Sequence, residues 1–324
     1  MLARPLGRFA AAILVPITLL FTGQVLAADG QLRTLDTAHG EIQVPANPQR
    51  VVTLYEAALD ATLAVGVEPL GAVATRGGTD VADYIADRAQ GVAIVGGPRE
   101  INLEEVLRQR PDLILASPFL AEADYQRLSR IAPTVVPKHD AERPFGDDYW
   151  RKESELFADA LGRHDQIEAV FEQLDQRIER LRQQLSPEGD VRVTLMRWNP
   201  QGPIVMSDKV FAGDVLRRLG FVAPEIARTL SSRPHTDMLS LENLGRADGD
   251  WLLLATLNAE GRDALAAAQR QPAFQRLEAV RNGHVLTVDG QLWTSAAGPL
   301  AAERILDQIE EKMLGEPAAD IAAQ

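Results

Sequence analysis

The chain has 324 residues, no cysteine and a formal net charge of −13 at pH 7. Without cysteine it can form no disulfide bond and carry no lipid on a thiol. The acidic balance argues against a nucleic-acid partner, because a phosphate backbone requires a basic protein surface. Local arginines would therefore have to hold any anionic ligand.

Residues 1–27 predict a secretory signal peptide. Arg4 and Arg8 form a basic start, an apolar run follows, and small residues lead to a cleavage site at Ala27. The apolar run is too short and too quickly followed by polar residues for a membrane span. An unanchored exported protein would diffuse away from a cell with one membrane, so we expect the periplasm of a bacterium with two.

The remaining chain, about 297 residues, is long enough for two lobes, because single cores rarely grow beyond roughly 250–300 residues. In residues 28–145, short apolar runs alternate with helical patterns after a hairpin-like stretch at residues 31–44. This alternation predicts an α/β lobe with a mostly parallel sheet and an antiparallel pair at its edge.

Residues 146–187 carry no strand signal and predict the connection between the lobes. From His164 to Leu185, apolar residues recur every three or four positions, which predicts a long amphipathic helix that ends before Gly189. Residues 188–314 resume the α/β alternation, and residues 315–324 are expected to be disordered. The predicted fold is α/β, with two Rossmann-like lobes joined by one long interdomain α-helix.

Two stretches of the first lobe are echoed in the second, which predicts a like topology. Aligned without gaps, the first echo pairs Asn102 with Ser240, Leu103 with Leu241, Glu104 with Glu242, Arg108 with Arg246, Asp112 with Asp250 and Leu115 with Leu253. The second echo pairs Asp60 with Asp214 and Gly66 with Gly220.

Glu104 and Glu242 follow the predicted helix N-caps Asn102 and Ser240, and Glu105 completes a capping-box pattern with Asn102. One interpretation is that each acid only complements its helix dipole. The other starts from the open edge of a parallel sheet, where strand carboxyl ends and helix amino ends meet. Two lobes that face each other there would present one exposed glutamate on each lip of a crevice, available to a basic partner.

The chain resembles the periplasmic substrate-binding proteins of ABC importers for ferric siderophores and vitamin B12, the type with a single helix between the lobes. The resemblance runs from about residue 47 to residue 314 and rests on "PQRVVTLYEAALDATLAVGVEPLGAV", "INLEEVLRQRPDLILAS", "IAPTVV", "FAGDVLRRLGF" and "WTSAAGPLAAERIL". It implies a binding protein rather than an enzyme. It also implies that Glu104 and Glu242 dock onto arginines of an inner-membrane permease, and that the long helix limits lobe closure to a small hinge motion.

Candidate ligand contacts end strands or begin the loops that follow them. They are Tyr55, Glu56, Arg76, Arg99, Ser117 and Phe119 in the first lobe, and Arg197, Trp198, Arg233 and Trp293 in the second. Arg99 comes first, because hydroxamate-binding relatives carry an arginine just before the capped helix and a guanidinium fork suits carboxylate or hydroxamate oxygens. Trp198 and Trp293 would offer flat apolar faces, whereas Trp251 is expected in the core.

No cofactor and no metal site of the protein's own is expected. The five histidines are scattered and none has the spacing of a helical ligand pair. Iron would therefore arrive inside its chelator. We expect a monomer that binds a ferric siderophore, with citrate or hydroxamate types favoured over catecholates.

Four other interpretations stay open. Cobalamin is a ligand of the same importer class, and so is haem, although haem-binding relatives place a tyrosine where this chain has Pro98 and Arg99. An exported α/β hydrolase is the enzymatic alternative, but no G-x-S-x-G, P-loop or H-E-x-x-H motif occurs. A structural envelope protein is disfavoured by the two-lobed design.

Overall fold

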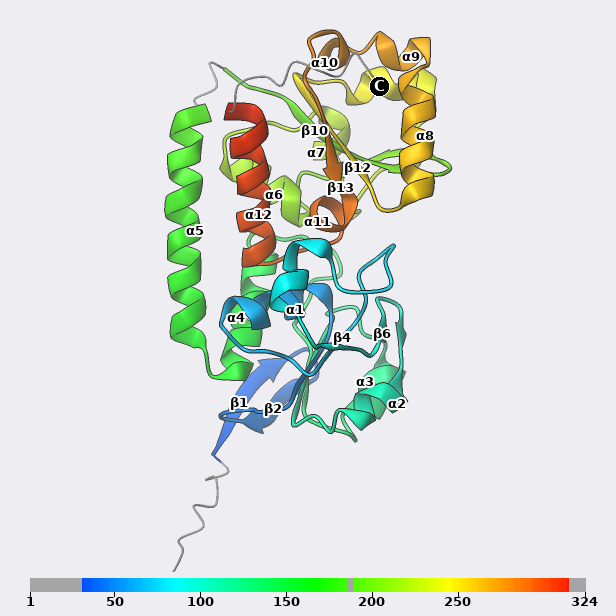
Figure 1. The fold of residues 1–324 in the computed structure, drawn as a ribbon. Helices are drawn as coiled ribbons and strands as arrows, with labels where there is room; N and C mark the ends of the chain where they lie inside the picture. The colour runs from blue at the N-terminus through cyan, green and yellow to red at the C-terminus, as the bar shows by residue number, and fades with distance from the viewer. Residues whose placement is uncertain (1–30, 186–188, 315–324) are drawn as a thin grey trace, which may run out of the picture. The chain divides into compact units, whose positions relative to one another are not determined.

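The computed structural model describes residues 31–185 and 189–314 (Figure 1). The predicted signal peptide and the predicted disordered tail lie outside these ranges. Within the described part of the chain, no helix is both long and apolar enough to cross a membrane.

The N-terminal lobe contains a five-stranded sheet in the order β5-β4-β3-β8-β9, and every pairing in it is parallel. Its central strands are buried along their whole length, as expected of strands covered on both faces. An antiparallel pair precedes this sheet, as predicted, and a second short pair lies before α2. The bounds are β1 Leu32–Thr37, β2 Gly40–Pro45, β3 Val51–Leu54, α1 Glu56–Ala64, β4 Gly71–Ala72, the 3-10 helix η1 Asp83–Arg88, β5 Ala93–Ile94, β6 Gly96–Gly97, β7 Glu100–Ile101, α2 Leu103–Arg108, β8 Leu113–Ala116, α3 Glu122–Leu128 and β9 Thr134–Val135.

The C-terminal lobe contains a four-stranded sheet in the order β11-β10-β12-β13. Strand β10 pairs in parallel with β12, and β12 with β13, while β11 returns antiparallel to β10 at the edge. The bounds are β10 Val193–Asn199, β11 Gly202–Val205, α6 Phe211–Arg218, α7 Glu225–Arg228, the 3-10 helix η2 Leu241–Ala247, β12 Trp251–Thr256, α8 Ala259–Gln269, α9 Pro272–Gln275, α10 Glu278–Arg281, β13 Val285–Asp289, α11 Gly290–Thr294, α12 Pro299–Ile309 and a final π-helical turn η3 Glu310–Leu314.

Two helices connect the sheets, α4 at Tyr149–Leu161 and α5 at His164–Leu185. The bounds of α5 are those predicted from its apolar periodicity, whereas the sequence pattern does not distinguish α4 from the rest of the connection. Gly162 ends α4 with φ 71°, and a Cβ there would lie 2.8 Å from the carbonyl oxygen of Ala46. Only glycine therefore fits this turn without strain. In Figure 1, α5 runs beside α12, and Arg177 of α5 pairs with Glu303, Asp307 and Glu310.

The predicted echo between the lobes is visible in matching hydrogen bonds. Asp112, just before β8, accepts from the backbone N–H of Arg50, which directly precedes β3 (2.9 Å). Asp250, just before β12, accepts from the backbone N–H of Arg192, which directly precedes β10 (2.6 Å). Each aspartate thus aligns the starts of two neighbouring parallel strands, so the two lobes share this local construction.

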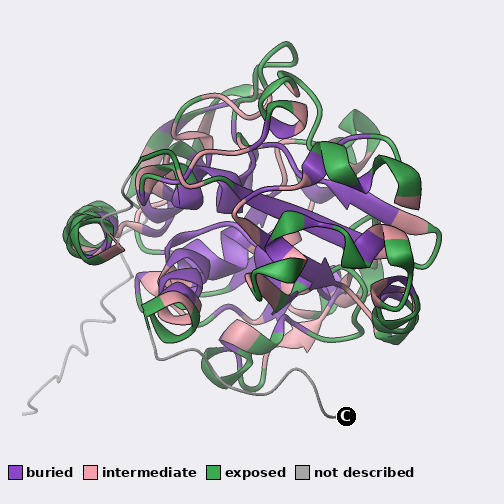
Figure 2. Cartoon of the chain, turned by 90° about the horizontal axis from the view of Figure 1, so that it is seen from above, coloured by how far each residue is buried: buried purple, intermediate pink, exposed green. Residues whose placement is uncertain are grey.

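The largest apolar cluster belongs to both lobes at once. It joins β3 and β8 of the first sheet to β10 and β12 of the second through residues of α1, α4, α5, α6 and α12. Each lobe also has apolar clusters of its own. Figure 2 shows the strands buried in the interior and the exposed residues on the outer helices and loops. Several helices, not α5 alone, therefore hold the lobes together.

Candidate functional site

A cleft of about 680 Å³ is lined by residues of both lobes, which is within the size range of small-molecule sites. The first lobe contributes residues from the carboxyl ends of β3 and β8, and the second contributes the carboxyl half of β10 and the segment after α11. This is the edge at which a ligand crevice is expected in parallel sheets. The predicted contacts at the cleft are Tyr55, Glu56, Arg76, Arg99, Ser117, Phe119, Arg197 and Trp293.

Three arginines reach this cleft, Arg76 and Arg99 from the first lobe and Arg197 from the second. Within residues 31–185 and 189–314, none of the three guanidinium groups has an ion pair or a hydrogen bond. Arg76 and Arg99 are solvent-exposed, so water can hydrate them. Arg197 is only 7% exposed, and its Nε is buried with no partner in the described part of the chain. Burial, with a smaller contribution from the charge of Arg76, lowers the pKa of Arg197 to about 10.

A buried cation without a counter-ion is costly in the unliganded protein. An anionic ligand in this cleft would supply the missing partner. The arginines come from opposite lobes, so one anion that contacts all three would also hold the lobes together.

Aromatic side chains form the apolar part of the cleft. Phe119 is 59% exposed and packs edge-on against His139, and Phe145 packs in the same way against Tyr149. Trp293 lines the cleft but is 2% exposed, because its indole is packed inward and Nε1 donates to Gln308 (2.7 Å). Together these rings can contact the organic part of a ligand whose charged groups face the arginines.

The cleft also has an acidic element that the sequence analysis did not identify. Glu153 of α4 is 6% exposed, and burial raises its pKa to about 8 although the nearby Tyr55 hydroxyl lowers it. Tyr149, one turn earlier on α4, accepts a hydrogen bond from the backbone N–H of Phe211 (3.0 Å). A signal was present in the sequence, since Glu153 lies between Trp150 and Phe157 on the apolar stripe of a helix, where a carboxylate is unusual.

Trp198 is a correction to the predicted site. It is 2% exposed and packs against Phe274 in an apolar cluster of the C-terminal lobe, away from the cleft. Successive residues of a strand point to opposite faces, so Arg197 and Trp198 cannot both face the ligand. The structure assigns the cleft to Arg197.

Arg233 is not brought to the cleft either. Its neighbours Ser232 and Pro234 line the cleft, whereas Arg233 is exposed and pairs with Asp237 four residues later. Trp251, expected in the core, is partly buried and stacks on the ring of His284.

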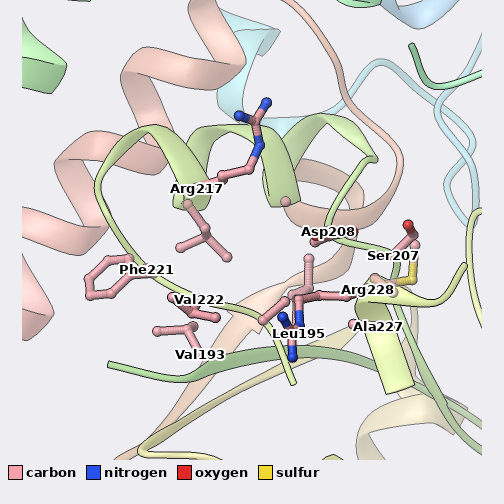
Figure 3. A pocket seen from close by; sticks show the side chains of 13 residues that line it. Val193, Leu195, Ser207, Asp208, Arg217, Phe221, Val222, Ala227 and Arg228 are labelled. Atoms are coloured by element: carbon pink, nitrogen blue, oxygen red, sulfur yellow. The ribbon is translucent and has the colours of Figure 1, made fainter. Parts of the chain in front are cut away.

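A second, smaller cavity of about 200 Å³ lies within the C-terminal lobe, between β10 and α6 (Figure 3). Its lining is mostly apolar, and Figure 3 shows the Arg217 guanidinium pointing away from the apolar side chains. Arg217 is also paired with Asp214. Because this cavity has residues of one lobe only and is much smaller, the interlobe cleft is the candidate ligand site.

Glu104 and Glu242 are both exposed in the first turn of a helix, as predicted. The two helices differ, however. The Asn102 side chain caps α2 by accepting from the N–H of Glu105 (3.2 Å), while the carboxylate of Glu105 pairs with Arg108 and does not complete the capping box. Ser240 makes no capping bond, which corrects the prediction, and η2 is a 3-10 helix.

The described residues contain no group of three or more histidine, aspartate or glutamate side chains arranged to hold a metal ion. The arginines and aromatic rings therefore remain the main chemical features of the cleft.

Comparison with known proteins assigns the family. Residues 51–292 match the model of the family described as periplasmic binding protein. The chain is 31% identical to the probable siderophore-binding lipoprotein YfiY of Bacillus subtilis (strain 168) over 297 residues, which cover 89% of each protein. It is 28% identical to the Fe(3+) dicitrate-binding periplasmic protein FecB of Escherichia coli (strain K12) over 290 residues, 89% of this chain and 93% of that protein.

A solved structure has the same fold. The Staphylococcus aureus protein SirA, complexed with staphyloferrin B, superposes with a TM-score of 0.75 at 24% identity, over 87% of this chain and 98% of that one. The two-lobed α/β fold and the family model agree, and the predictions of a binding protein rather than an enzyme are confirmed. The chain belongs to the periplasmic binding protein family and works outside the cytoplasm as a binding component of transport.

Proposed function

We propose that this protein captures a ferric siderophore in the periplasm and delivers it to an ABC permease of the inner membrane. The observation that carries the proposal is a set of three arginines at the interlobe cleft whose guanidinium groups are unpaired among the described residues, and of which Arg197 is buried. The names of relatives support the same ligand class, because YfiY is described as siderophore-binding and FecB as Fe(3+) dicitrate-binding.

The arrangement favours a chelate with carboxylate or hydroxamate oxygens. A guanidinium supplies a planar fork of donors that matches such oxygens, and each charge-assisted hydrogen bond contributes roughly 1.5–3 kcal/mol. Arg99 and Arg76 would hold the exposed side of the chelate, and Arg197 the buried side. Tyr55, Ser117, Phe119 and Trp293 would contact its remaining surface.

Delivery requires a docking surface, and Glu104 and Glu242 are proposed to provide it. Both are exposed, and they belong to corresponding positions of the two lobes. Opposite charges on a permease would orient the loaded protein over the transport path, since electrostatic complementarity mainly sets encounter rate and register.

The ligand class is tested by titrating the purified protein and following tryptophan emission, because Trp293 lines the cleft. Probes are ferric citrate, a ferric trihydroxamate, a ferric catecholate, haem and cobalamin, with the iron-free chelators as controls. We expect quenching at sub-micromolar ferric citrate or ferric hydroxamate, and Arg99→Ala to weaken binding about tenfold or more. Binding of haem or cobalamin alone, or of none of the probes, would refute the proposal.

A further inference from the structure

Glu153 lines the cleft with one carboxyl oxygen that no group in the described part of the chain satisfies. The residue is 6% exposed, and its Oε2 is buried with no hydrogen-bond partner among the described residues. Native proteins rarely leave a buried polar atom unpaired, and each exception requires an explanation. Because this atom belongs to a residue that lines the candidate ligand site, a bound ligand is the natural partner.

The groups around Glu153 come from three elements. The hydroxyl of Tyr55, the N-cap residue of α1, lies near enough to the carboxyl group to lower its pKa. Tyr149 lies one turn earlier on α4 and is held by the backbone N–H of Phe211 at the start of α6. Glu56, next to Tyr55, is engaged by the hydroxyl of Thr75 and the backbone N–H of Arg76. Two phenols thus lie beside Glu153, whereas the carboxylate of Glu56 is already paired with other groups.

No cation compensates this carboxyl group within the described chain. Arg76 and Arg197 line the same cleft, but the pKa of Glu153 is set by its burial and by the nearby Tyr55 hydroxyl. Burial dominates and raises the pKa to about 8, so the group is mostly neutral at pH 7.

Glu153 could meet the ligand either as an ionised carboxylate or as a neutral carboxyl group, and the charge of the proposed ligand decides between the two. An ionised carboxylate would repel an anionic chelate held by the three arginines. A neutral carboxyl group has an O–H to donate and adds no negative charge. We propose, as a deepening of the function proposed above, that Glu153 binds the ligand in its neutral form and donates a hydrogen bond to an anionic oxygen of the chelate.

This role predicts a pH dependence carried by one residue. If only the neutral form binds, the apparent affinity is reduced by the neutral fraction. With a pKa of about 8 in the free protein, affinity should fall about tenfold between pH 7 and pH 9. Binding at pH 9 should take up about one proton from solvent, as each Glu153 carboxylate is converted to the acid.

The test is isothermal calorimetry with ferric citrate between pH 6.5 and pH 9, for the wild type and for Glu153→Gln. Glutamine is a neutral isostere with an amide donor, so Glu153→Gln should bind at pH 7 nearly as well as the wild type. Proton uptake on binding is measured by comparing the binding enthalpy in two buffers of different ionisation enthalpy. The Glu153→Gln variant should show no such uptake. The speciation of ferric citrate changes with pH but affects both proteins equally, so it cancels in the ratio of the Glu153→Gln affinity to the wild-type affinity. This ratio should be about tenfold higher at pH 9 than at pH 7.

Two further variants sharpen the result. Glu155→Gln makes the same change on the same helix outside the cleft residues, and it should keep the wild-type pH profile. Tyr55→Phe removes the hydroxyl that lowers the pKa of Glu153, so the loss of affinity should move to higher pH. Circular dichroism and thermal unfolding confirm that each variant is folded.

The outcomes separate this inference from the proposed function. Equal pH profiles for the wild type and Glu153→Gln would overturn the role of Glu153 while leaving siderophore binding intact. A wild-type affinity that rises above pH 8, with loss of binding in Glu153→Gln, would show a carboxylate that accepts from a cationic ligand group, and would also overturn it. If ferric citrate is not bound, the ferric chelate that binds most tightly in the panel is the probe. Failure of every ferric chelate would refute the proposed function and the inference together.

Discussion

Arg197 and Trp198 are neighbours on strand β10, yet one faces the cleft and the other faces the core. Strand β10 is buried along nearly its whole length, and a strand covered on both faces reads as a continuous apolar run. Its sequence therefore does not indicate which residues face the cleft. The pairing of β10 with β12 and β11 places Arg197 at the ligand site and Trp198 in the core.

Arg197→Met should separate ligand affinity from stability. Methionine fills a similar volume without a charge. The unliganded protein should therefore gain about 1–3 kcal/mol of unfolding free energy when this buried guanidinium, unpaired among the residues described, is removed. Binding of ferric citrate or a ferric hydroxamate should weaken tenfold or more, as for about 1.5–3 kcal/mol of lost charge-assisted bonding. Urea unfolding and tryptophan titration measure the two effects.

Arg233→Met is the matched control, because Arg233 is exposed and lies outside the cleft. It should change neither quantity appreciably. A destabilised Arg197→Met protein with unchanged affinity would contradict the assignment of Arg197 to the ligand.

Among the elements, the echoed aspartates were visible in the sequence but their partners were not. Asp60 of α1 accepts from the backbone N–H groups of Leu300 and Ala301 at the start of α12 (2.9 and 2.8 Å) and from the hydroxyl of Tyr84. Its counterpart Asp214 of α6 accepts from the Trp150 indole of α4 (3.0 Å). A pattern within one helix cannot reveal a contact 240 residues away along the chain.

Local pattern reasoning succeeded where one segment determines its own structure. The bounds of α5 follow from its apolar periodicity, and the cap of α2 follows from Asn102. The same reasoning failed at Ser240, because the 3-10 form of η2 and the absence of its cap depend on the surrounding chain. It also missed Glu153, since a search along strand ends does not examine helix α4.

Asp60→Ala should destabilise the protein strongly. The substitution leaves two N–H groups at the buried start of α12 without acceptors, and each buried unsatisfied group costs about 1–3 kcal/mol. We expect a loss of about 2–4 kcal/mol in urea unfolding. Asp83→Ala, an exposed residue of η1, should change stability by less than about 0.5 kcal/mol. Similar losses for both variants would show that Asp60 has no special role.

At the scale of the whole molecule, buried acids predict how stability depends on pH. Burial raises the pKa of Asp60 to about 7 and that of Glu153 to about 8. The folded state then keeps protons that the unfolded chain releases near pH 4, so this stabilisation is present at low pH and is lost as pH rises toward 7 and 8.

We therefore expect the unfolding free energy to fall by about 5 kcal/mol between pH 5.5 and pH 8.5, because each pKa unit corresponds to about 1.4 kcal/mol. Denaturant unfolding at a series of pH values measures this decline. The double variant Asp60→Asn with Glu153→Gln should show a much flatter profile over the same range. A wild-type stability that increases with pH in this window would contradict the assignment of raised pKa values to these two acids.

The proposed docking surface is a property of both lobes together. Reversing both charges, with Glu104→Arg and Glu242→Arg, should leave ligand affinity within about twofold while uptake of labelled ferric siderophore by cells stops, because like charges would face the permease. Ligand titration and an uptake assay in a strain that lacks the native protein measure the two properties. Glu105→Arg is a control on the same helix, and continued uptake by the double variant would refute the docking role.

The apolar cluster shared by the two sheets has a consequence for unloading. To swing the lobes widely apart, the protein would have to expose packed side chains of α1, α4, α6 and α12 to water, which is unfavourable in proportion to the area exposed. Free and loaded forms should therefore have nearly the same radius of gyration in solution scattering. The ligand would then rarely leave through spontaneous opening of the lobes. Release would instead require the permease to separate the lobes.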